Sequence, residues 1–220
     1  MTRPSVLSSG ARQSTKSEAI PRVLVVDDDV SVRESLELLI CSAGWVPETY
    51  ACAAAFLARP AVAAPSCVVL DLSLPDGDGL DLQERLAGDR AGPPIVFLTG
   101  YGDVPKTVRA MKGGAFEFLV KPVRDDVLLA AISCAIERSD AELRRNADSR
   151  MLRECHASLT SREREVFSLV VAGRLNKQIA AELAISEVTV KAHRGKVMRK
   201  MGARSLADLV KMAAKLGVSA

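Results

Sequence analysis

The chain has 220 residues, a length that fits one large domain or two ordinary ones. Hydrophobic residues make up 48% and charged residues 26%, as in soluble globular proteins, and aromatic residues make up only 4%, so the core must be mostly aliphatic. The longest uncharged stretch, from Ala91 to Gly102, falls short of the ~18 apolar residues of a transmembrane helix. The N-terminus lacks the apolar segment of a signal peptide, so we expect a cytoplasmic protein without membrane contact.

Charge is divided unevenly along the chain. Residues 151–220 contain 13 Lys and Arg against 6 Asp and Glu, a balance of +7, whereas residues 1–150 contain 17 against 21, a balance of −4. An acidic first part and a basic second part indicate two modules, the second facing a polyanion. The five cysteines form no Cys-x-x-Cys pair, so a disulfide scaffold and a zinc site are both poor interpretations, and reduced cysteines fit better.

In chain order, residues 1–20 come first, and their serine-rich, aperiodic sequence predicts a disordered extension. Short apolar runs then alternate with helix-like segments near residues 30–43, 52–59, 78–88 and 104–113. The runs are Val23–Val26, Val46–Tyr50, Cys67–Leu70, Ile95–Leu98 and Phe116–Val120. Apolar strands that alternate with helices predict an α/β fold with a five-stranded, parallel, doubly wound sheet.

A further helix is expected after Pro122, running through a charged, weakly periodic stretch toward His156. From Leu159 onward all signals are helical. Thr160 begins a capping box, and Ser205 begins a similar helix-start signal. The chain therefore divides into the extension at 1–20, an α/β domain at 21–138, a linker helix at 139–157 and an all-α domain at 158–220.

Polar residues follow four of the predicted strands. Asp27, Asp28 and Asp29 follow the first strand, Asp71 the third, Thr99 the fourth and Lys121 the fifth. The carboxyl ends of parallel strands share one edge, where ligands bind, so at least three carboxylates, a hydroxyl and an ammonium should meet there. Close carboxylates repel unless a cation lies between them, and oxygen ligands favour Mg²⁺. One carboxylate could then attack a phosphoryl donor. Taken singly, each acid is more simply a turn former, but the whole set favours a site.

Residues 21–123 resemble the receiver domain of two-component response regulators, with its flavodoxin-like fold. The matching stretches are VLVVDDD, VVLDLSLPDGDGLDL, IVFLTGYGDV and AMKGGAFEFLVKP. The resemblance implies that Asp71 accepts the phosphoryl group, and that Mg²⁺ is bound by Asp28, by the Ser73 carbonyl and, through water, by Asp27. It further implies that Thr99 and Lys121 contact the phosphoryl group.

The same resemblance implies a switch. Phosphorylation adds about two negative charges, Thr99 moves toward them, and Phe118 turns inward and reshapes the face around it. The simpler alternative for Phe118 is a static core aromatic. The family has a cis peptide at the position of Lys121–Pro122.

The basic part has the pattern of a helix-turn-helix. A short helix over 176–183 is followed by a turn at Ala184–Ile185 and by a helix over 186–201. On a helical wheel, Val190, Val197 and Met201 share one face, and the opposite face carries Ala192, Gly195, Lys196 and Arg199, with Lys191 at its margin. Small and basic outward residues fit a DNA major groove. A solvated basic surface is the plainer alternative.

Residues 159–205 resemble the LuxR-type helix-turn-helix, in a sequence that begins LTSREREVFSLVVAGRLNKQIAAEL. Together with the receiver they indicate the NarL/FixJ subfamily, in its FixJ-like branch. Residues 186–201 would form the recognition helix, with Lys191, Lys196 and Arg199 on DNA and Asn176 and Lys177 on phosphates. We expect Arg194 to form an intramolecular ion pair, and the final helix to dimerise on DNA.

Two functions compete on this evidence. The first is a DNA-binding transcription regulator, not an enzyme, that a sensor histidine kinase phosphorylates at Asp71. It would dimerise when phosphorylated and bind double-stranded promoter DNA, with RNA polymerase as a further candidate partner. The second is a metal-dependent phosphohydrolase that uses Asp71 as nucleophile and Asp76 or Asp78 as second acid. The chain lacks room for a cap domain over a substrate pocket, which favours the regulator.

Overall fold

The computed structural model describes residues 19–60, 64–87, 92–100 and 102–218. The expected extension at 1–20 lies almost wholly outside this range. The chain forms two compact units that divide between Glu142 and Leu143. None of the helices among the described residues is long and apolar enough to cross a membrane.

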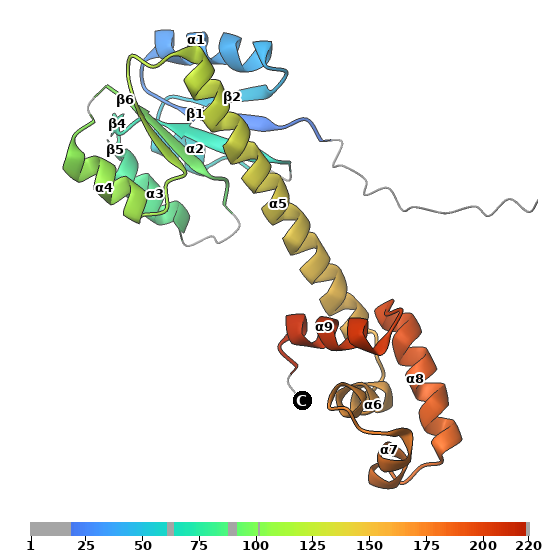
Figure 1. The fold of residues 1–220 in the computed structure, drawn as a ribbon. Coiled ribbons are helices and arrows are strands. Elements are labelled where there is room, and N and C mark those ends of the chain that lie inside the picture. The colour runs from blue at the N-terminus through green and yellow to red at the C-terminus, as the bar shows by residue number, and fades with distance from the viewer. Residues whose placement is uncertain (1–18, 61–63, 88–91, 101, 219–220) are drawn as a thin grey trace, which may run out of the picture. The chain divides into compact units, whose positions relative to one another are not determined.

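The first unit contains a five-stranded parallel sheet in the order β2-β1-β3-β6-β7 (Figure 1). Its strands are β1 (Arg22–Val26), β2 (Val46–Tyr50), β3 (Ser66–Leu70), β6 (Ile95–Thr99) and β7 (Glu117–Val120). Strands β3 and β6 are buried along their whole length, because helices cover both faces of the sheet, and this explains their uninterrupted apolar sequence. The predicted fold class and the five predicted strands are confirmed.

The sheet separates two apolar cores. On one face, Leu36 and Ile40 of α1 (Val30–Ser42) pack with Leu128 and Ile132 of α5 (Asp125–Ala157). On the other face, Phe56 of α2 (Ala53–Leu57) packs with side chains of α3 (Gly79–Ala87) and α4 (Val104–Lys112). These helices lie within one or two residues of their predicted bounds, and α5 continues without a break to Ala157.

A two-stranded antiparallel hairpin follows the third strand and was not predicted. Its strands are β4 (Ser73–Leu74) and β5 (Gly77–Asp78), with Ser73 opposite Asp78. Strands of two residues carry no periodicity that a sequence pattern can detect. The hairpin leads directly into α3, and the N–H of Gly79 at the start of that helix donates to the Leu72 carbonyl over 2.7 Å.

The second unit is helical. It contains α6 (Ser161–Val171), α7 (Asn176–Glu182), α8 (Glu187–Met201) and α9 (Leu206–Leu216), besides the last turns of α5. The predicted caps are confirmed: Thr160 and Glu163 form a reciprocal capping box, and the Ser205 side chain accepts an N–H of the following first turn. The Ser186 side chain caps α8 in the same way. Ala184 turns the chain between α7 and α8 with a φ of 52°, a conformation that few residues other than glycine adopt.

Candidate functional site

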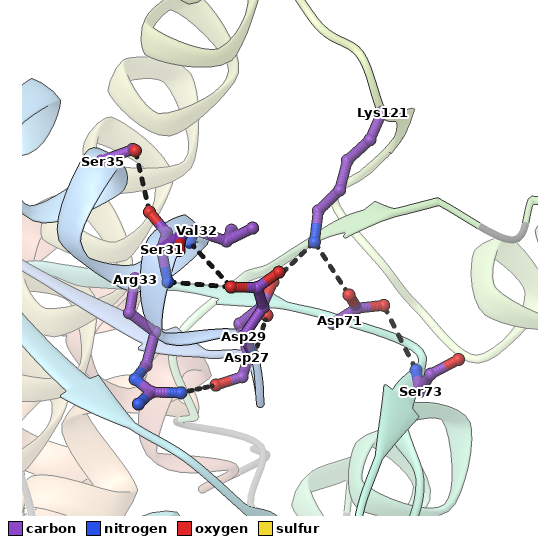
Figure 2. A network of polar contacts seen from close by, with 9 residues as sticks. All are labelled: Asp27, Asp29, Ser31, Val32, Arg33, Ser35, Asp71, Ser73 and Lys121. Carbon is purple, nitrogen blue, oxygen red and sulfur yellow. Dashed lines mark hydrogen bonds and ion pairs between the residues drawn. The ribbon is translucent and has the colours of Figure 1, made fainter.

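Two carboxylates and one ammonium meet at the carboxyl edge of the sheet (Figure 2). The Lys121 Nζ donates to Asp27 Oδ2 over 2.6 Å and to Asp71 Oδ2 over 2.9 Å. Backbone hydrogen bonds extend the sheet into the site, because the Asp71 N–H donates to Val26 and the Lys121 N–H donates to Thr99. The sheet therefore holds in place three residues that lie up to 94 positions apart in the sequence.

Burial sets the electrostatics of this group. Asp27 is only 3% exposed and Asp71 only 8%. Burial raises the pKa of Asp27 above its usual value, although hydrogen bonds from Lys121 and from the Asp29 N–H act in the opposite direction. For Lys121, burial acts to lower the pKa, but its hydrogen bonds to the two carboxylates outweigh burial and raise it. Lys121 is therefore fully protonated at neutral pH and provides the positive charge between the two acids.

The backbone around Asp71 is tightly packed. The Ser73 N–H donates to Asp71 Oδ1 over 3.2 Å, while the other oxygen faces Lys121. Gly79 lies directly behind, and a Cβ at this position would come within 2.3 Å of the Asp71 carbonyl oxygen. Only glycine fits there without moving the chain of Asp71. Gly79, the second glycine of the motif DGDGLDL, thus has a structural role that the sequence analysis did not recognise.

The third acid of the first strand end caps a helix. Asp29 Oδ1 accepts the Ser31 N–H over 2.8 Å, so it forms the N-cap of α1. Its own N–H donates to Asp27 Oδ1 over 2.9 Å. Arg33, which the sequence analysis did not single out, donates to the Asp27 carbonyl over 2.7 Å. These contacts fix both the side chain and the backbone of Asp27.

The expected convergence of three carboxylates is only partly seen. Asp28 is exposed and takes no part in the network of Asp27, Asp71 and Lys121. Among the described residues, no three or more His, Cys, Asp or Glu side chains are grouped so that they could hold a metal ion. Lys121 supplies positive charge between two of the acids, Asp27 and Asp71.

Two residues beside this network were expected to take part in switching. Thr99, the last residue of β6, is fully buried. Phe118, on β7, is half-buried, with its ring 5.8 Å from that of Phe97. A Cβ on Gly102 would lie 3.2 Å from the Phe118 ring and 2.8 Å from a methyl of Val120, so the loop before α4 lies against this aromatic ring. The Lys121–Pro122 peptide bond is cis, as expected.

The acids that the phosphohydrolase alternative requires are bound to backbone amides. Asp76 accepts the Ala53 and Ala54 N–H groups at 3.0 and 2.8 Å, and these hydrogen bonds lower its pKa. Asp78 Oδ1 accepts the Leu80 N–H over 2.9 Å at the start of α3. A general acid needs a raised pKa, so Asp76 is unsuited to that role.

The second unit presents a basic helix face. Val190, Val197 and Met201 of α8 are buried, as the helical wheel predicted. Lys191, Lys196 and Arg199 on the same helix are exposed, and Lys177 of α7 is exposed as well. The residues expected to contact DNA, other than Asn176, are therefore accessible.

Arg194 connects the two helices of the helix-turn-helix. It donates to Asn176 Oδ1 over 2.5 Å, so its partner is a neutral carboxamide and not the acid that the sequence analysis expected. Asn176 is only partly exposed, and its carboxamide oxygen is already engaged. Its NH₂ group remains the part with which a phosphate could interact.

A partly buried ion pair joins α6 to α8. Glu163 Oε2 accepts from the Lys200 Nζ over 2.6 Å and from the Thr160 N–H over 2.9 Å. The hydrogen bond from Lys200 is the main reason that the pKa of Glu163 falls to about 2. Lys200 also donates to the Ser158 carbonyl, so this basic residue of α8 stabilises the fold and is turned away from the exposed basic face.

A parallel sheet with a buried acid pair and a lysine at its carboxyl edge, followed by a helical unit with a basic recognition-type helix, defines a receiver with a DNA-binding output. Comparisons with known proteins support this class. Residues 23–133 match the response regulator receiver domain, and residues 157–213 match the bacterial regulatory proteins of the luxR family.

Full-length relatives share the same organisation. The chain is 46% identical over 211 residues to Nodulation protein W of Bradyrhizobium diazoefficiens, covering 96% of this chain and 92% of that protein. It is 40% identical over 196 residues to the transcriptional regulatory protein FixJ of the same species, covering 89% and 96%. The solved structure of the response regulator StyR superimposes with a TM-score of 0.82 at 47% identity, covering 90% of this chain and all of that one.

The chain therefore belongs to the two-component response regulators that combine a receiver with a LuxR-type helix-turn-helix domain, in the FixJ-like group. FixJ and StyR are named as regulators, so the regulator is preferred to the phosphohydrolase.

Proposed function

We propose that the protein is a cytoplasmic transcription regulator that a sensor histidine kinase switches by Mg²⁺-dependent phosphorylation of Asp71. Phosphorylation would promote dimerisation through the face around Phe118 and binding to double-stranded promoter DNA, with RNA polymerase as a further partner. The observation that carries this proposal is the contact of one lysine ammonium with both Asp27 and Asp71 at the carboxyl edge of the sheet. We propose the domain bounds 21–138, 139–157 and 158–220, with residues 1–20 as the extension.

The chemistry at Asp71 follows from its contacts. A carboxylate oxygen of Asp71 attacks the phosphorus of a phosphohistidine, the O–P bond forms, and the N–P bond breaks. The electron pair of that bond returns to the imidazole, which takes up a proton. The Lys121 ammonium, already 2.9 Å from Asp71 Oδ2, stabilises the negative charge of the phosphoryl oxygens. Thr99, the last residue of the neighbouring strand β6, would donate its hydroxyl to the phosphoryl group.

The oxygen-rich donor set at this edge fits Mg²⁺, since Asp27 and Asp71 already share one small site. Asp28, Asp71 and the Ser73 carbonyl would hold the ion directly, and Asp27 through water. When bound, Mg²⁺ supplies positive charge that offsets the phosphoryl oxygens and the acids together.

The DNA side of the proposal depends on the exposed basic face of the second unit. Lys191, Lys196 and Arg199 on α8 would contact bases or phosphates, and Lys177 and the Asn176 NH₂ group would contact phosphates. Arg194 would act through Asn176 by holding its oxygen.

The decisive experiment compares Asp71→Asn with Asp126→Asn, a control that removes an exposed acid whose ion pair is with Arg124. The full-length proteins are incubated with labelled acetyl phosphate and Mg²⁺, and then with a promoter library. We expect the control to be labelled and to bind DNA more tightly after labelling, and Asp71→Asn to do neither. Persistent labelling of Asp71→Asn would refute the assignment of the acceptor. Labelling of the control without any change in DNA binding would refute the switch.

A further inference from the structure

The first turn of α8 exposes a large apolar side chain. Val188 is 76% exposed, whereas Val190, two residues further along, is fully buried. A single exposed valine is common on protein surfaces and needs a second observation before it acquires a meaning. That observation is its position among the charged residues of the helix.

Val188 lies at the N-terminal end of the exposed face of α8. At the spacing of an α-helix, Ala192, Gly195 and Arg199 lie on the same side as Val188, and Lys191 and Lys196 lie on either side of these residues. All of these residues are exposed. The buried residues Val190, Val197 and Met201 lie on the opposite side. Val188 is thus the apolar member of the face on which the proposed function places DNA.

The first turn of α8 is also held by hydrogen bonds. The Ser186 hydroxyl lies 2.8 Å from the Thr189 hydroxyl and accepts the Thr189 N–H over 3.1 Å. Both neighbouring hydroxyls are therefore engaged within the protein, and the carboxylate of Glu187 has the same charge sign as phosphate. A valine in a helix strongly prefers one side-chain rotamer, so its two methyl groups have a nearly fixed position.

The major groove presents only one apolar group to such a side chain, the C5 methyl of thymine. The basic residues of this face attract the helix to the DNA phosphates. Removing the Val188 side chain from water on that face is favourable only where it contacts another apolar group, such as a methyl group. We infer that Val188 is a specificity-determining residue that reads a thymine methyl in each half-site of the target DNA. This inference rests on the proposed DNA-binding function and extends it to a base preference.

The test removes the methyl group from either partner. The full-length protein, incubated with acetyl phosphate and Mg²⁺, first selects its site from a random duplex library. Each thymine of the selected half-site is then replaced, one at a time, by deoxyuracil, which differs from thymine only by the missing methyl. We expect one symmetry-related thymine at which deoxyuracil weakens binding about fourfold, the effect of one buried methyl.

Val188→Ala should reduce affinity for the duplex with thymine at that position. The ratio of its affinities for the thymine and deoxyuracil duplexes should then be close to one. Lys196→Ala is the matched control, since it should weaken binding to both duplexes equally and keep the ratio. Circular dichroism of each variant confirms that α8 is intact. An unchanged ratio in Val188→Ala, or no thymine sensitive to its methyl, overturns the inference and leaves DNA binding standing. Failure to select any duplex overturns the proposed function as well.

Discussion

Gly195 offers a sharp test of how the basic helix is built, because it lies in the middle of α8 where glycine is normally avoided. A Cβ at Gly195 would meet nothing within 4 Å, so alanine can be added without a clash. Glycine in a helix interior costs about 1 kcal/mol relative to alanine, so Gly195→Ala should stabilise the second unit by about that amount.

The matched control is Gly202→Ala at the end of the same helix. A Cβ at Gly202 also meets nothing within 4 Å, but the residue has a φ of 67°, in the left-handed region. Alanine there should destabilise the unit by about 1 kcal/mol, because L-residues are disfavoured in that conformation. The same glycine-to-alanine change should therefore raise the stability of the second unit at position 195 and lower it at position 202, although both positions have room for a Cβ.

Hydrogen exchange measured by mass spectrometry on peptides from α8 follows the second unit within the full-length protein. The single tryptophan, Trp45, lies in the first unit, so its fluorescence serves as an internal control that should not change. Faster exchange in Gly195→Ala would refute the reasoning, since it would mean that the glycine is needed for packing. We further expect Gly195→Ala to bind promoter DNA no more tightly than the wild type, because its methyl group points to the proposed DNA face. A more stable variant with tighter binding would remove Gly195 from the contact surface.

The remaining predictions concern buried charges and salt dependence. Asp27→Asn should stabilise the first unit at pH 7, measured by urea unfolding with Trp45 fluorescence, because burial raises the pKa of Asp27 and thus disfavours its ionised form. In the wild type this contribution should decrease stability as pH rises from 3.8 through the raised pKa, a slope that Asp27→Asn should lack. Stability of the second unit should fall as pH drops from 4.5 toward about 2, because the pKa of Glu163 is lowered in the folded state, and Glu163→Gln should flatten this dependence in a circular dichroism titration. Lys196→Ala should reduce the salt slope of DNA binding by about one, and an equal slope in Lys196→Ala and the wild type would exclude a phosphate contact.

Much of the fold could be predicted because its signals are local. Strands β3 and β6 are buried on both faces and are apolar throughout, and the caps Thr160, Ser186 and Ser205 lie directly beside the helices they begin. The carboxyl-edge rule also predicted that Asp27, Asp71 and Lys121 would meet, although the sequence separates them widely.

The features that could not be predicted depend on tertiary contacts. The N-terminus of α2 has no local cap, because Cys52 makes no such hydrogen bond, and Asp76 supplies the acceptor from more than twenty residues away. Lys200 looks like another basic residue of α8, but it is paired with Glu163 at a separation of 37 residues. The sequence pattern also does not show how the neighbouring acids differ, since Asp27 is buried whereas Asp28 is exposed.

The network at the carboxyl edge has an uneven stoichiometry: two acids depend on a single ammonium. An anionic group attached to Asp71 would compete with Asp27 for the Lys121 ammonium. Each hydrogen bond from Lys121 to that group would be lost to Asp27. Asp27 would then need a replacement counter-charge at the moment the modification arrives. Adding one anionic group to the site therefore redistributes hydrogen-bond partners among residues that follow three different strands.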